Sequence, residues 1–372
     1  MQKDPIRFAA DGRPRARGLG LPFDGTPGAF NAITDVGGVE VGFATLVRGQ
    51  GKLEVGRGPV RTGVTAILPR GHGSDYLPVW AGIFALNGNG EMTGSHWIED
   101  AGHFYGPICL TNTHSVGAVH HAAVGWMVKH YPAFDGSAWA MPVVAETFDG
   151  HLNDVNGRHV TEADALAALD GAATGPLPEG NVGGGTGMIA YEFKGGTGTA
   201  SRRIKLTQGE FTVGALVQAN FGIRPWLTVL GVPVGRHLTE DRIWSRDTGS
   251  IIALVGTDAP LLAAQLQRCA KRIGLGVGRT GTPSGNSSGD IFLAFSTANA
   301  IKPAKGAMPT LAFLPDDDLD PLYLGLVQAV EEAILNAMIA AETMVGRDGH
   351  RVVALDHGAL LALMRRYGRL AG

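Results

Sequence analysis

The sequence has few cysteines and few charges, and each scarcity excludes a class of protein. Only 2 cysteines occur in 372 residues, too few for a disulfide scaffold, and Cys109 and Cys269 stand in apolar surroundings typical of buried, reduced thiols. Charged residues make up 17%, the net charge is -3, and the basic residues are scattered. This pattern argues against nucleic acid or an anionic membrane surface as a partner, and leaves small molecules and peptides.

Long apolar runs and cofactor motifs are also missing. No uncharged stretch reaches the ~18 apolar residues of a membrane span, and the N-terminal segment lacks the apolar core of a signal peptide. We therefore expect a soluble, cytoplasmic protein that does not bind membranes, with a periplasmic location left open. The patterns HExxH, CxxC and GxxxxGK[ST] do not occur. The sequence thus predicts no metal and no cofactor.

Glycine is the residue present in excess. The chain contains 56 glycines without a collagen-like period, interleaved with hydrophobic segments that bring the apolar content to 44%. Such a chain can bury a large core, and its glycines indicate many tight turns and close backbone approaches. The segment GLGVGRTG (274–281) follows a predicted helix instead of opening one, so we interpret it as a turn and not as a phosphate loop.

Strand-like runs alternate in blocks with helical patterns. Strands are expected within residues 33–47, 63–69, 77–86, 106–112, 141–148, 182–221, 251–257 and 289–297. Helices are expected over residues 115–130, 161–171, 259–274 and 319–346, with Ser115 and Asp258 as caps of the first and third. The blocks indicate an α+β fold of sheets covered by helix layers. Without a repeat or linker, we expect a single structural domain over residues 1–372.

A polar turn stands directly before an apolar strand in RDTGSIIALVGTDAPLL (246–262). Its Gly249-Ser250 dipeptide recurs three more times in the chain, so by itself it indicates only a turn. Chemistry offers a second interpretation, because glycine has no Cβ to obstruct attack of the Ser250 hydroxyl on the preceding carbonyl. Hydrolysis of the resulting ester would free Ser250 as an N-terminus, whose α-amine lies beside its own hydroxyl as a built-in base.

A second polar cluster, SGNSSGD (284–290), also runs straight into a predicted strand. It places Ser288 and Asp290 where a hydroxyl and a carboxylate could line the same site. On composition alone an ordinary solvated turn is the favoured interpretation, because Ser, Gly, Asn and Asp are the usual turn residues. Both interpretations stay open on the residues alone.

Seven segments, taken in order, resemble the DmpA-like family of self-cleaving aminopeptidases, which includes L-aminopeptidase/D-amidase-esterases and β-peptidyl aminopeptidases. They are NGNGEMTG (87–94), GPICLTNTHSVG (106–117), PVVAETFDGHLND (142–154), GGGTGM (183–188), LVQANFG (216–222), GSIIALVGTDAPLL (249–262) and SGNSSGDIFLAFST (284–297). The likeness runs from roughly residue 25 to residue 345. An ordered series of motifs is much more specific than any one of them.

The resemblance implies how the chain is processed and folded. A precursor would be cut between Gly249 and Ser250 into an α-chain, residues 1–249, and a β-chain, residues 250–372. The two would fold together as a four-layer αββα sandwich that resembles N-terminal-nucleophile hydrolases but has different connectivity. A homo-oligomer of αβ heterodimers is also implied.

The resemblance also assigns site residues. The nucleophile falls on Ser250, the supporting hydroxyl and carboxylate on Ser288 and Asp290, and the oxyanion-binding amide on Asn220. One position departs from the family, which often has a tyrosine as a second oxyanion donor where this chain has Phe148. Another donor must replace that hydroxyl, or turnover falls by ~100 to 1000 fold.

The implied activity is release of N-terminal residues from short peptides, aminoacyl amides or esters through an acyl-enzyme on Ser250. L-, D- and β-aminoacyl groups all remain candidates, and either the freed α-amine or the pair Ser288 and Asp290 moves the proton. An aminopeptidase must also bind a free ammonium, for which Glu146 and Asp135 are the candidate carboxylates. Trp139 is a candidate wall of the side-chain pocket.

Two other functions stay open. An acyltransferase related to the ornithine acetyltransferases would share this topology and also cleave itself, but those enzymes have threonine at the cleavage point where this chain has serine. The other alternative is a small-molecule binder that keeps the fold and never cuts itself.

Overall fold

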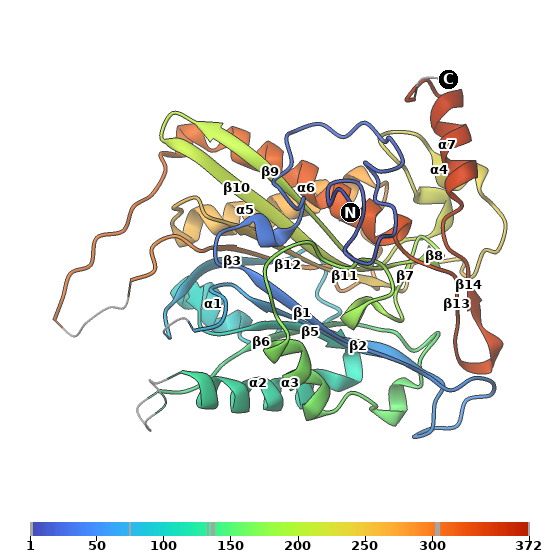
Figure 1. Cartoon of the computed structure of the whole chain (residues 1–372), viewed down its shortest axis with the longest axis horizontal. Helices are drawn as coiled ribbons and strands as arrows, with labels where there is room; N and C mark the ends of the chain where they lie inside the picture. Colours follow the sequence, from blue (N-terminus) through green and yellow to red (C-terminus); the bar gives the residue numbers. More distant parts are fainter. Residues whose placement is uncertain (1–2, 74–75, 132–133, 135–137, 302–305, 371–372) are drawn as a thin grey trace.

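The computed structural model describes residues 3–73, 76–131, 134, 138–301 and 306–370 (Figure 1). Its helices are α1 Ser95–Ala101, α2 Val116–His130, α3 Glu162–Asp170, α4 Val234–His237, α5 Ala263–Arg279, α6 Asp320–Ile339 and α7 His357–Arg366. Its strands are β1 Glu40–Arg48, β2 Val60–Leu68, β3 Val79–Ala85, β4 His103–Phe104, β5 Ile108–Asn112, β6 Val143–Thr147, β7 Ile189–Ala190, β8 Phe193–Lys194, β9 Gly196–Leu206, β10 Gly209–Asn220, β11 Ser250–Thr257, β12 Ile291–Ser296, β13 Met344–Val345 and β14 Arg351–Val352.

The described elements form four layers. A four-stranded sheet in the order β1-β2-β5-β6 faces a six-stranded sheet in the order β4-β3-β12-β11-β10-β9. Helices α2 and α3 cover the outer face of the first sheet, and α5 and α6 cover the outer face of the second (Figure 1). This is the αββα sandwich expected from the family resemblance, and the α+β prediction is confirmed.

Alternation along the strands explains why the layers hold together. β11 is buried at all its positions because each of its faces meets a different apolar layer. Ile252 and Leu254 point into the core between the two sheets. Ile251, Ala253 and Val255 point into the core beneath the helices. A strand buried on both faces reads as a continuous apolar run, which is the pattern of residues 251–257.

Helix α6 is long and apolar enough to cross a membrane by length and composition, but its surroundings explain that character differently. Of its most apolar window, 78% is buried inside the protein. It packs against α5, β9 and β10, and its buried face includes Glu332 and Asn336 as well as apolar residues. We conclude that α6 is a core helix of the sandwich.

The structure corrects several expected boundaries. The helix predicted to reach residue 346 ends at Ile339, and the residues after it lead into β13. Asp258 does not cap α5, because its carboxylate accepts the backbone N-H of Thr212 at 2.7 Å and the helix begins only at Ala263. Ser115 makes no side-chain cap for α2, because a 3-10 turn that starts at residue 113 precedes the helix. At Asp258 a tertiary hydrogen bond overrode the local capping signal.

Both cysteines are free and buried, as the sequence predicted. Burial raises the pKa of both Cys109 and Cys269 to about 12. At that pKa the thiolate form is rare near neutral pH, so neither side chain is an effective nucleophile.

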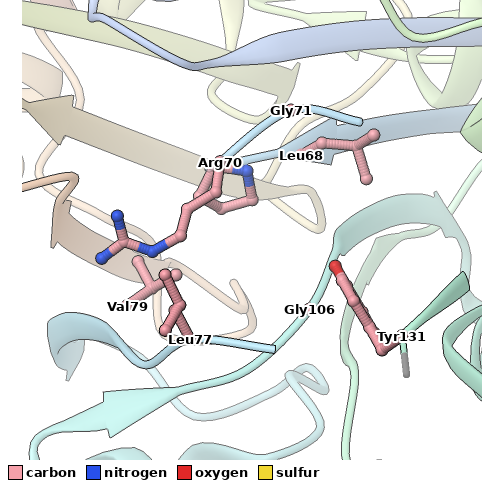
Figure 2. Close-up of a pocket in the computed structure, with 8 residues that line it drawn as sticks. Leu68, Arg70, Gly71, Leu77, Val79, Gly106 and Tyr131 are labelled. Carbon is pink, nitrogen blue, oxygen red and sulfur yellow. The ribbon is translucent and has the colours of Figure 1, made fainter. Parts of the chain in front are cut away.

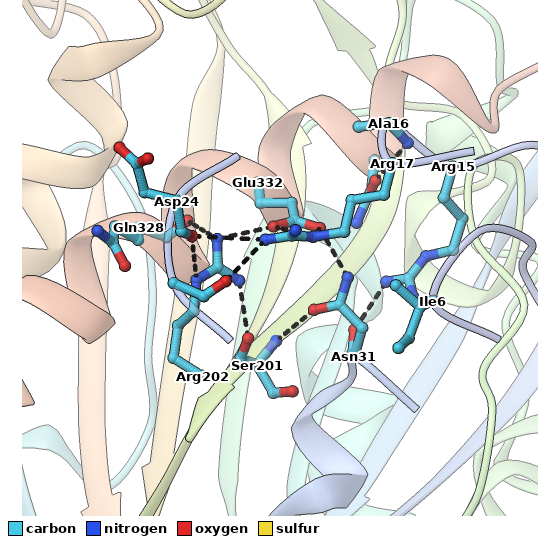
Figure 3. Close-up of polar contacts among 12 residues, drawn as sticks. Ile6, Arg15, Ala16, Arg17, Asp24, Asn31, Ser201, Arg202, Gln328 and Glu332 are labelled. Atoms are coloured by element: carbon cyan, nitrogen blue, oxygen red, sulfur yellow. Dashed lines mark hydrogen bonds and ion pairs between the residues drawn. The ribbon is translucent and has the colours of Figure 1, made fainter. Parts of the chain in front are cut away.

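A buried ion-pair network ties the N-terminal segment to the helical layer (Figure 3). The Glu332 carboxylate on α6 accepts hydrogen bonds from Arg17 Nε at 2.9 Å, Arg202 Nη2 at 2.7 Å and Asn31 Nδ2 at 2.6 Å. Asn31 Oδ1 in turn accepts the backbone N-H of Ser201 at 3.0 Å. Burial acts to raise the pKa of Glu332, but the two arginines outweigh it and hold that pKa below its ordinary value.

Replacing Glu332 with alanine tests how much this network stabilises the fold. We expect Glu332→Ala to lower the free energy of unfolding by about 3 to 5 kcal/mol, because the buried guanidinium of Arg202 and the partly buried one of Arg17 lose their carboxylate. Because the folded pKa is lowered, the stabilisation is complete above the ordinary carboxyl pKa and is lost as the pH falls through the folded value. Denaturant unfolding at several pH values measures both effects.

Glu54→Ala is the matched control, because Glu54 pairs with Arg57 on the surface, where the two side chains are 63% and 83% exposed. Equal losses of stability in the two variants would contradict the assigned role of the network.

Candidate active site

Strand register brings three distant segments together at one end of the six-stranded sheet. β10 and β11 are antiparallel, and Asn220 lies directly opposite Ser250. β12 runs parallel to β11 with Ile291 opposite Ile252, so Asp290 stands beside the start of β11. The Ile251 N-H donates to Asp290 Oδ1 at 3.1 Å, which fixes that carboxylate next to the nucleophile candidate.

Ser250 is 9% exposed and its Oγ accepts the backbone N-H of Gly289 at 2.9 Å. The chain on either side of this contact has no room for a side chain. A Cβ at Gly249 would lie 1.9 Å from the Asn220 carbonyl oxygen, and one at Gly289 would lie 2.3 Å from the Asn89 carbonyl oxygen. Glycine is therefore a steric requirement on both sides of the hydroxyl.

Asp290 gathers hydroxyl donors around a buried carboxylate. Ser288 Oγ donates to Oδ1, the oxygen that also accepts the Ile251 N-H, and Ser284 Oγ donates to Oδ2. Burial raises the pKa of Asp290 above its ordinary value, although the two serine hydroxyls oppose the rise. A carboxylate with a raised pKa is a better proton acceptor, as a general base requires.

Asn220 is 5% exposed, and its hydrogen bonds fix which way the side-chain amide points. Its Oδ1 accepts the backbone N-H of Ile189 at 2.8 Å. Only the oxygen can accept, so the amide nitrogen must point the other way, where Nδ2 donates to the Phe148 carbonyl at 3.0 Å. The side chain therefore presents a fixed N-H donor at the end of β10.

Phe148 contributes its main chain to this arrangement and no side-chain donor. Its ring is 49% exposed and lies over Gly150, where a Cβ would be 2.3 Å from a ring carbon. The side chain at this position therefore offers no second donor to an oxyanion, as the sequence indicated.

Glu146 reaches the site from β6 of the facing sheet. It is 5% exposed, and its carboxylate accepts the Glu91 N-H at 3.1 Å and the hydroxyl of Thr113. Gly90 lies between Glu146 and Gly289, the residue whose N-H contacts Ser250. A Cβ placed on Gly90 would be 3.3 Å from Glu146 Oε1 and 3.4 Å from the Cα of Gly289. Burial raises the pKa of Glu146.

Of the other two candidates, the structure describes only Trp139, and it does not bring this residue into the cluster. Asp135 lies outside the described residues. Trp139 is 66% exposed and borders a cavity of about 450 Å³, whose walls contain none of Ser250, Ser288 and Asp290. The residues that line that cavity are Tyr76, Trp97, His103, Tyr105, Ala138, Trp139 and Met141.

A second cavity lies beside Arg70 and is far too small for a peptide (Figure 2). Its volume is about 10 Å³, close to the space of one water. The Arg70 guanidinium donates to the carbonyls of Thr297 at 3.0 Å and Pro78 at 2.7 Å, which gives this side chain a structural role.

Sequence reasoning missed the asparagines that support the site. Asn87 Nδ2 donates to Ser284 Oγ at 2.7 Å and to the Gly285 carbonyl at 2.9 Å. Asn89 Nδ2 donates to the Ser287 carbonyl at 2.7 Å. The signal was present in the alternating letters NGNG, where glycines permit a tight loop and amides satisfy neighbouring carbonyls, but the partners are about 200 residues away.

Asp247 is a further residue that the sequence reasoning did not single out. Its Oδ1 accepts the N-H groups of Gly222 at 3.0 Å and Gly249 at 3.1 Å, which presses the residue before Ser250 against the end of β10. Its Oδ2 is buried and has no hydrogen-bond partner among the described residues. The available signal was the D-T-G turn, since aspartate commonly bonds a backbone N-H two residues on.

Among the residues that the structure describes, no group of three or more His, Cys, Asp or Glu side chains is placed to hold a metal ion. The chemistry available at the cluster therefore consists of a hydroxyl held by a backbone N-H, a carboxylate carrying hydroxyl donors, an oriented amide and a second buried carboxylate.

The family comparison matches most of the chain. The model of peptidase family S58 matches residues 31–352. The beta-peptidyl aminopeptidase BapA of Sphingosinicella microcystinivorans is 51% identical over 376 residues, covering 96% of this chain and 93% of that protein. The beta-peptidyl aminopeptidase BapA of Sphingosinicella xenopeptidilytica is 46% identical over 368 residues, covering 95% and 91%.

Solved structures agree with these relatives. The L-aminopeptidase D-Ala-esterase/amidase of Ochrobactrum anthropi, described as a prototype for the serine aminopeptidases and a new variant among the Ntn hydrolase fold, is 55% identical with a TM-score of 0.92, covering 96% of this chain and 100% of that one. A beta-aminopeptidase of Burkholderia sp. is 47% identical with a TM-score of 0.88, covering 95% and 99%. The resemblance and the fold inferred from the sequence are confirmed.

The steric requirement at Gly289 can be tested directly. We expect Gly289→Ala to lower kcat/KM by about 100-fold, because the clash with the Asn89 carbonyl must displace the N-H that holds Ser250 Oγ, and small displacements at a reacting atom are costly. Hydrolysis of aminoacyl p-nitroanilides gives the rate. Gly278→Ala in α5 is the control, since a Cβ there meets nothing within 4 Å. Wild-type activity in Gly289→Ala would show that the contact is not needed.

Proposed function

Because the chain belongs to peptidase family S58 and is an aminopeptidase, we propose that it cuts itself before Ser250 and then works through an acyl-enzyme on that residue. The observation that carries the proposal is the pairing of Ser250 with Asn220 across β10 and β11. Residues paired directly across two antiparallel strands present their side chains side by side on one face of the sheet. The pairing thus places a hydroxyl beside an oriented amide donor, as attack on a carbonyl and stabilisation of its oxyanion require.

The cutting step follows from the local geometry. Ser250 Oγ attacks the Gly249 carbonyl carbon, the C-N bond of that peptide breaks, and the Ser250 nitrogen takes up a proton to become an α-amine. Water then hydrolyses the ester, which leaves a carboxylate on Gly249 and restores the hydroxyl. The products are an α-chain of residues 1–249 and a β-chain of residues 250–372.

The proton carrier differs between cutting and turnover. Before the cut, the Ser250 nitrogen belongs to a peptide bond and cannot act as a base. The hydroxyl proton must then pass to the pair formed by Ser288 and Asp290, which is supported by the raised pKa of the buried carboxylate. After the cut, the free α-amine lies on the same residue as the hydroxyl and becomes the general base of turnover.

We propose short peptides and aminoacyl amides or esters with a free amino terminus as substrates. Ser250 would accept the aminoacyl group, Asn220 would hold the oxyanion, and Glu146 would bind the substrate ammonium. The names of the beta-peptidyl aminopeptidase relatives support β-aminoacyl groups among these substrates, and the Ochrobactrum anthropi enzyme supports L-aminoacyl amides and D-alanyl esters and amides.

The peptidase relatives favour this function over the two alternatives. A non-cutting binder would need none of the arrangement around Ser250, and serine in place of threonine at the proposed cut argues against the acyltransferase. We further propose that the αβ units assemble into a homo-oligomer and act in the cytoplasm.

Replacing the nucleophile tests both parts of the proposal. We expect Ser250→Ala to stay a single chain and to lose turnover by on the order of 10⁶-fold, as other serine nucleophiles do. Mass spectrometry of the purified protein and p-nitroanilide hydrolysis measure the two effects. Ser287→Ala alters an exposed hydroxyl in the neighbouring loop and should cut and turn over as wild type. A Ser250→Ala protein that is still cut before residue 250, or still active, would overturn the proposal.

Glu146 gives a separate prediction about substrate binding. We expect Glu146→Gln to raise KM by about 10- to 100-fold for substrates with a free amino terminus, because a charge-assisted hydrogen bond is lost. Since the pKa of Glu146 is raised, its charge is lost at a higher pH than that of an ordinary glutamate as the solution is acidified. The wild-type kcat/KM should therefore fall on the acid side more steeply than protonation of the α-amine base alone explains, and this additional fall should disappear in Glu146→Gln.

The matched control is Glu99→Gln, which neutralises an exposed carboxylate on α1. An unchanged KM in Glu146→Gln would assign the ammonium to another group and leave the acyl-enzyme proposal untouched.

A further inference from the structure

Lys194, at the end of β8, is a buried cation with an unusual set of partners. It is 0% exposed, and its Nζ donates to the carbonyls of Met188 at 2.7 Å, Gly195 at 3.0 Å and Gly185 at 3.4 Å. Three acceptors match the three N-H groups of an ammonium, whereas a neutral amine has only two. No ion pair to Lys194 occurs among the residues that the structure describes.

This burial is costly for the charged form. Desolvation, with a smaller contribution from Arg13, lowers the pKa of Lys194 to about 7. A methionine of similar length would fill the same space without burying a charge. The ammonium therefore calls for an explanation beyond packing, and its carbonyl partners supply one.

The nearest of those carbonyls belongs to the peptide unit that holds the oxyanion amide. Met188 O and Ile189 N-H are the two ends of a single peptide group. Lys194 Nζ bonds one end at 2.7 Å, and the other end donates to Asn220 Oδ1 at 2.8 Å. Asn220 Nδ2 then donates from the far side of its amide. The path from ammonium to amide donor thus consists of two hydrogen bonds and two planar groups.

We propose that Lys194 is a positioning residue for catalysis, whose ammonium fixes and polarises the Met188–Ile189 peptide unit and thereby orients Asn220 and strengthens its Nδ2-H as an oxyanion donor. The inference rests on the role proposed above for Asn220.

Two physical effects carry the relay. A cation on a carbonyl oxygen withdraws electron density from the whole peptide group, so its N-H becomes a better donor. Successive hydrogen bonds in such a chain strengthen one another by about 10 to 30% per bond. The second effect is orientation, because the Ile189 N-H is what distinguishes the two ends of the Asn220 amide. Both effects act where negative charge develops in the transition state, so they should appear in kcat and not in KM.

The competing explanation is that Lys194 only closes the turn between β7 and β8. If that were its role, replacing Lys194 would lower stability or activity by the same amount whether or not Asn220 is present. A relay acts through Asn220 alone, so its effect must vanish when the amide is removed. A double-mutant cycle separates the two explanations.

The experiment compares Lys194→Met, Asn220→Ala and the double variant. We expect Lys194→Met to lower kcat at least 10-fold with KM nearly unchanged, and to lower it less than 2-fold in the Asn220→Ala background. Rates are expressed per processed site. Where a variant is cut incompletely, the rate of self-cleavage replaces kcat in the double-mutant cycle. This rate is measured as the appearance of the chain that begins at Ser250, and the cleavage step also forms an oxyanion that Asn220 would stabilise.

Two additional variants guard against trivial outcomes. Lys205→Met removes an exposed lysine on β9 and should behave as wild type. Lys194→Gln keeps N-H donors without the charge, so it serves if the methionine variant does not fold, and it should also lose kcat because it cannot polarise the peptide unit as a cation does. Thermal unfolding monitors the fold of each protein.

The outcomes separate this inference from the function on which it rests. An equal loss in both backgrounds, or a loss confined to KM or to thermal stability, would overturn the relay and leave the acyl-enzyme intact. Full kcat in Lys194→Met beside a strongly impaired Asn220→Ala would do the same. Full kcat in Asn220→Ala would overturn the oxyanion role and the relay together.

Discussion

The site depends on the register between β10 and β11. Side chains alternate along a strand, so a slip of one residue would turn Asn220 or Ser250 toward the opposite face of the sheet. Two constraints prevent that slip. β10 is paired along its length with β9 on one side and β11 on the other, and both faces of β11 carry apolar side chains into separate cores. The geometry of the proposed nucleophile is thus fixed by the burial of residues to which no chemical role is assigned.

Close packing of main chain around Ser250 is the second condition. The residue before it touches the backbone of β10 and the residue that donates to its hydroxyl touches the backbone at residue 89, so both must be glycine. A site built from main chain in this way has little freedom to relax. That rigidity suits the proposed function, in which one hydroxyl faces a peptide carbonyl of its own chain during cutting and a substrate carbonyl later.

The sequence carried much of this information, but only where it was local. Ser250, Ser288 and Asp290 stood out because polar turns precede apolar strands, and the resemblance assigned them roles. The apolar runs predicted most strands correctly, since a strand buried on both faces has a distinctive composition. These features are written within short windows of the chain.

Features that depend on distant partners could not be read in this way. From the sequence Asn87 resembles an ordinary loop residue, but its amide donates to Ser284 and to the Gly285 carbonyl. Asp258 was predicted to cap a helix, but its carboxylate accepts the Thr212 N-H. The Lys194 contacts could not be predicted from the sequence, because its three acceptors are backbone carbonyls, which every residue has whatever its side chain.

Glu332 differs from the two buried carboxylates near Ser250 in the groups that surround it. Glu332 is matched by two guanidinium groups, so its charge is neutralised locally and its pKa falls below the ordinary value. Asp290 and Glu146 have hydroxyl and N-H donors but no cation among their hydrogen-bond partners in the described part of the chain, and burial raises their pKa values. The two arginines therefore hold the Glu332 carboxylate in its charged form, whereas Asp290 and Glu146, held by neutral donors, take up a proton more readily. This difference fits a stabilising role for Glu332 and the roles in proton transfer and ammonium binding proposed for the other two carboxylates.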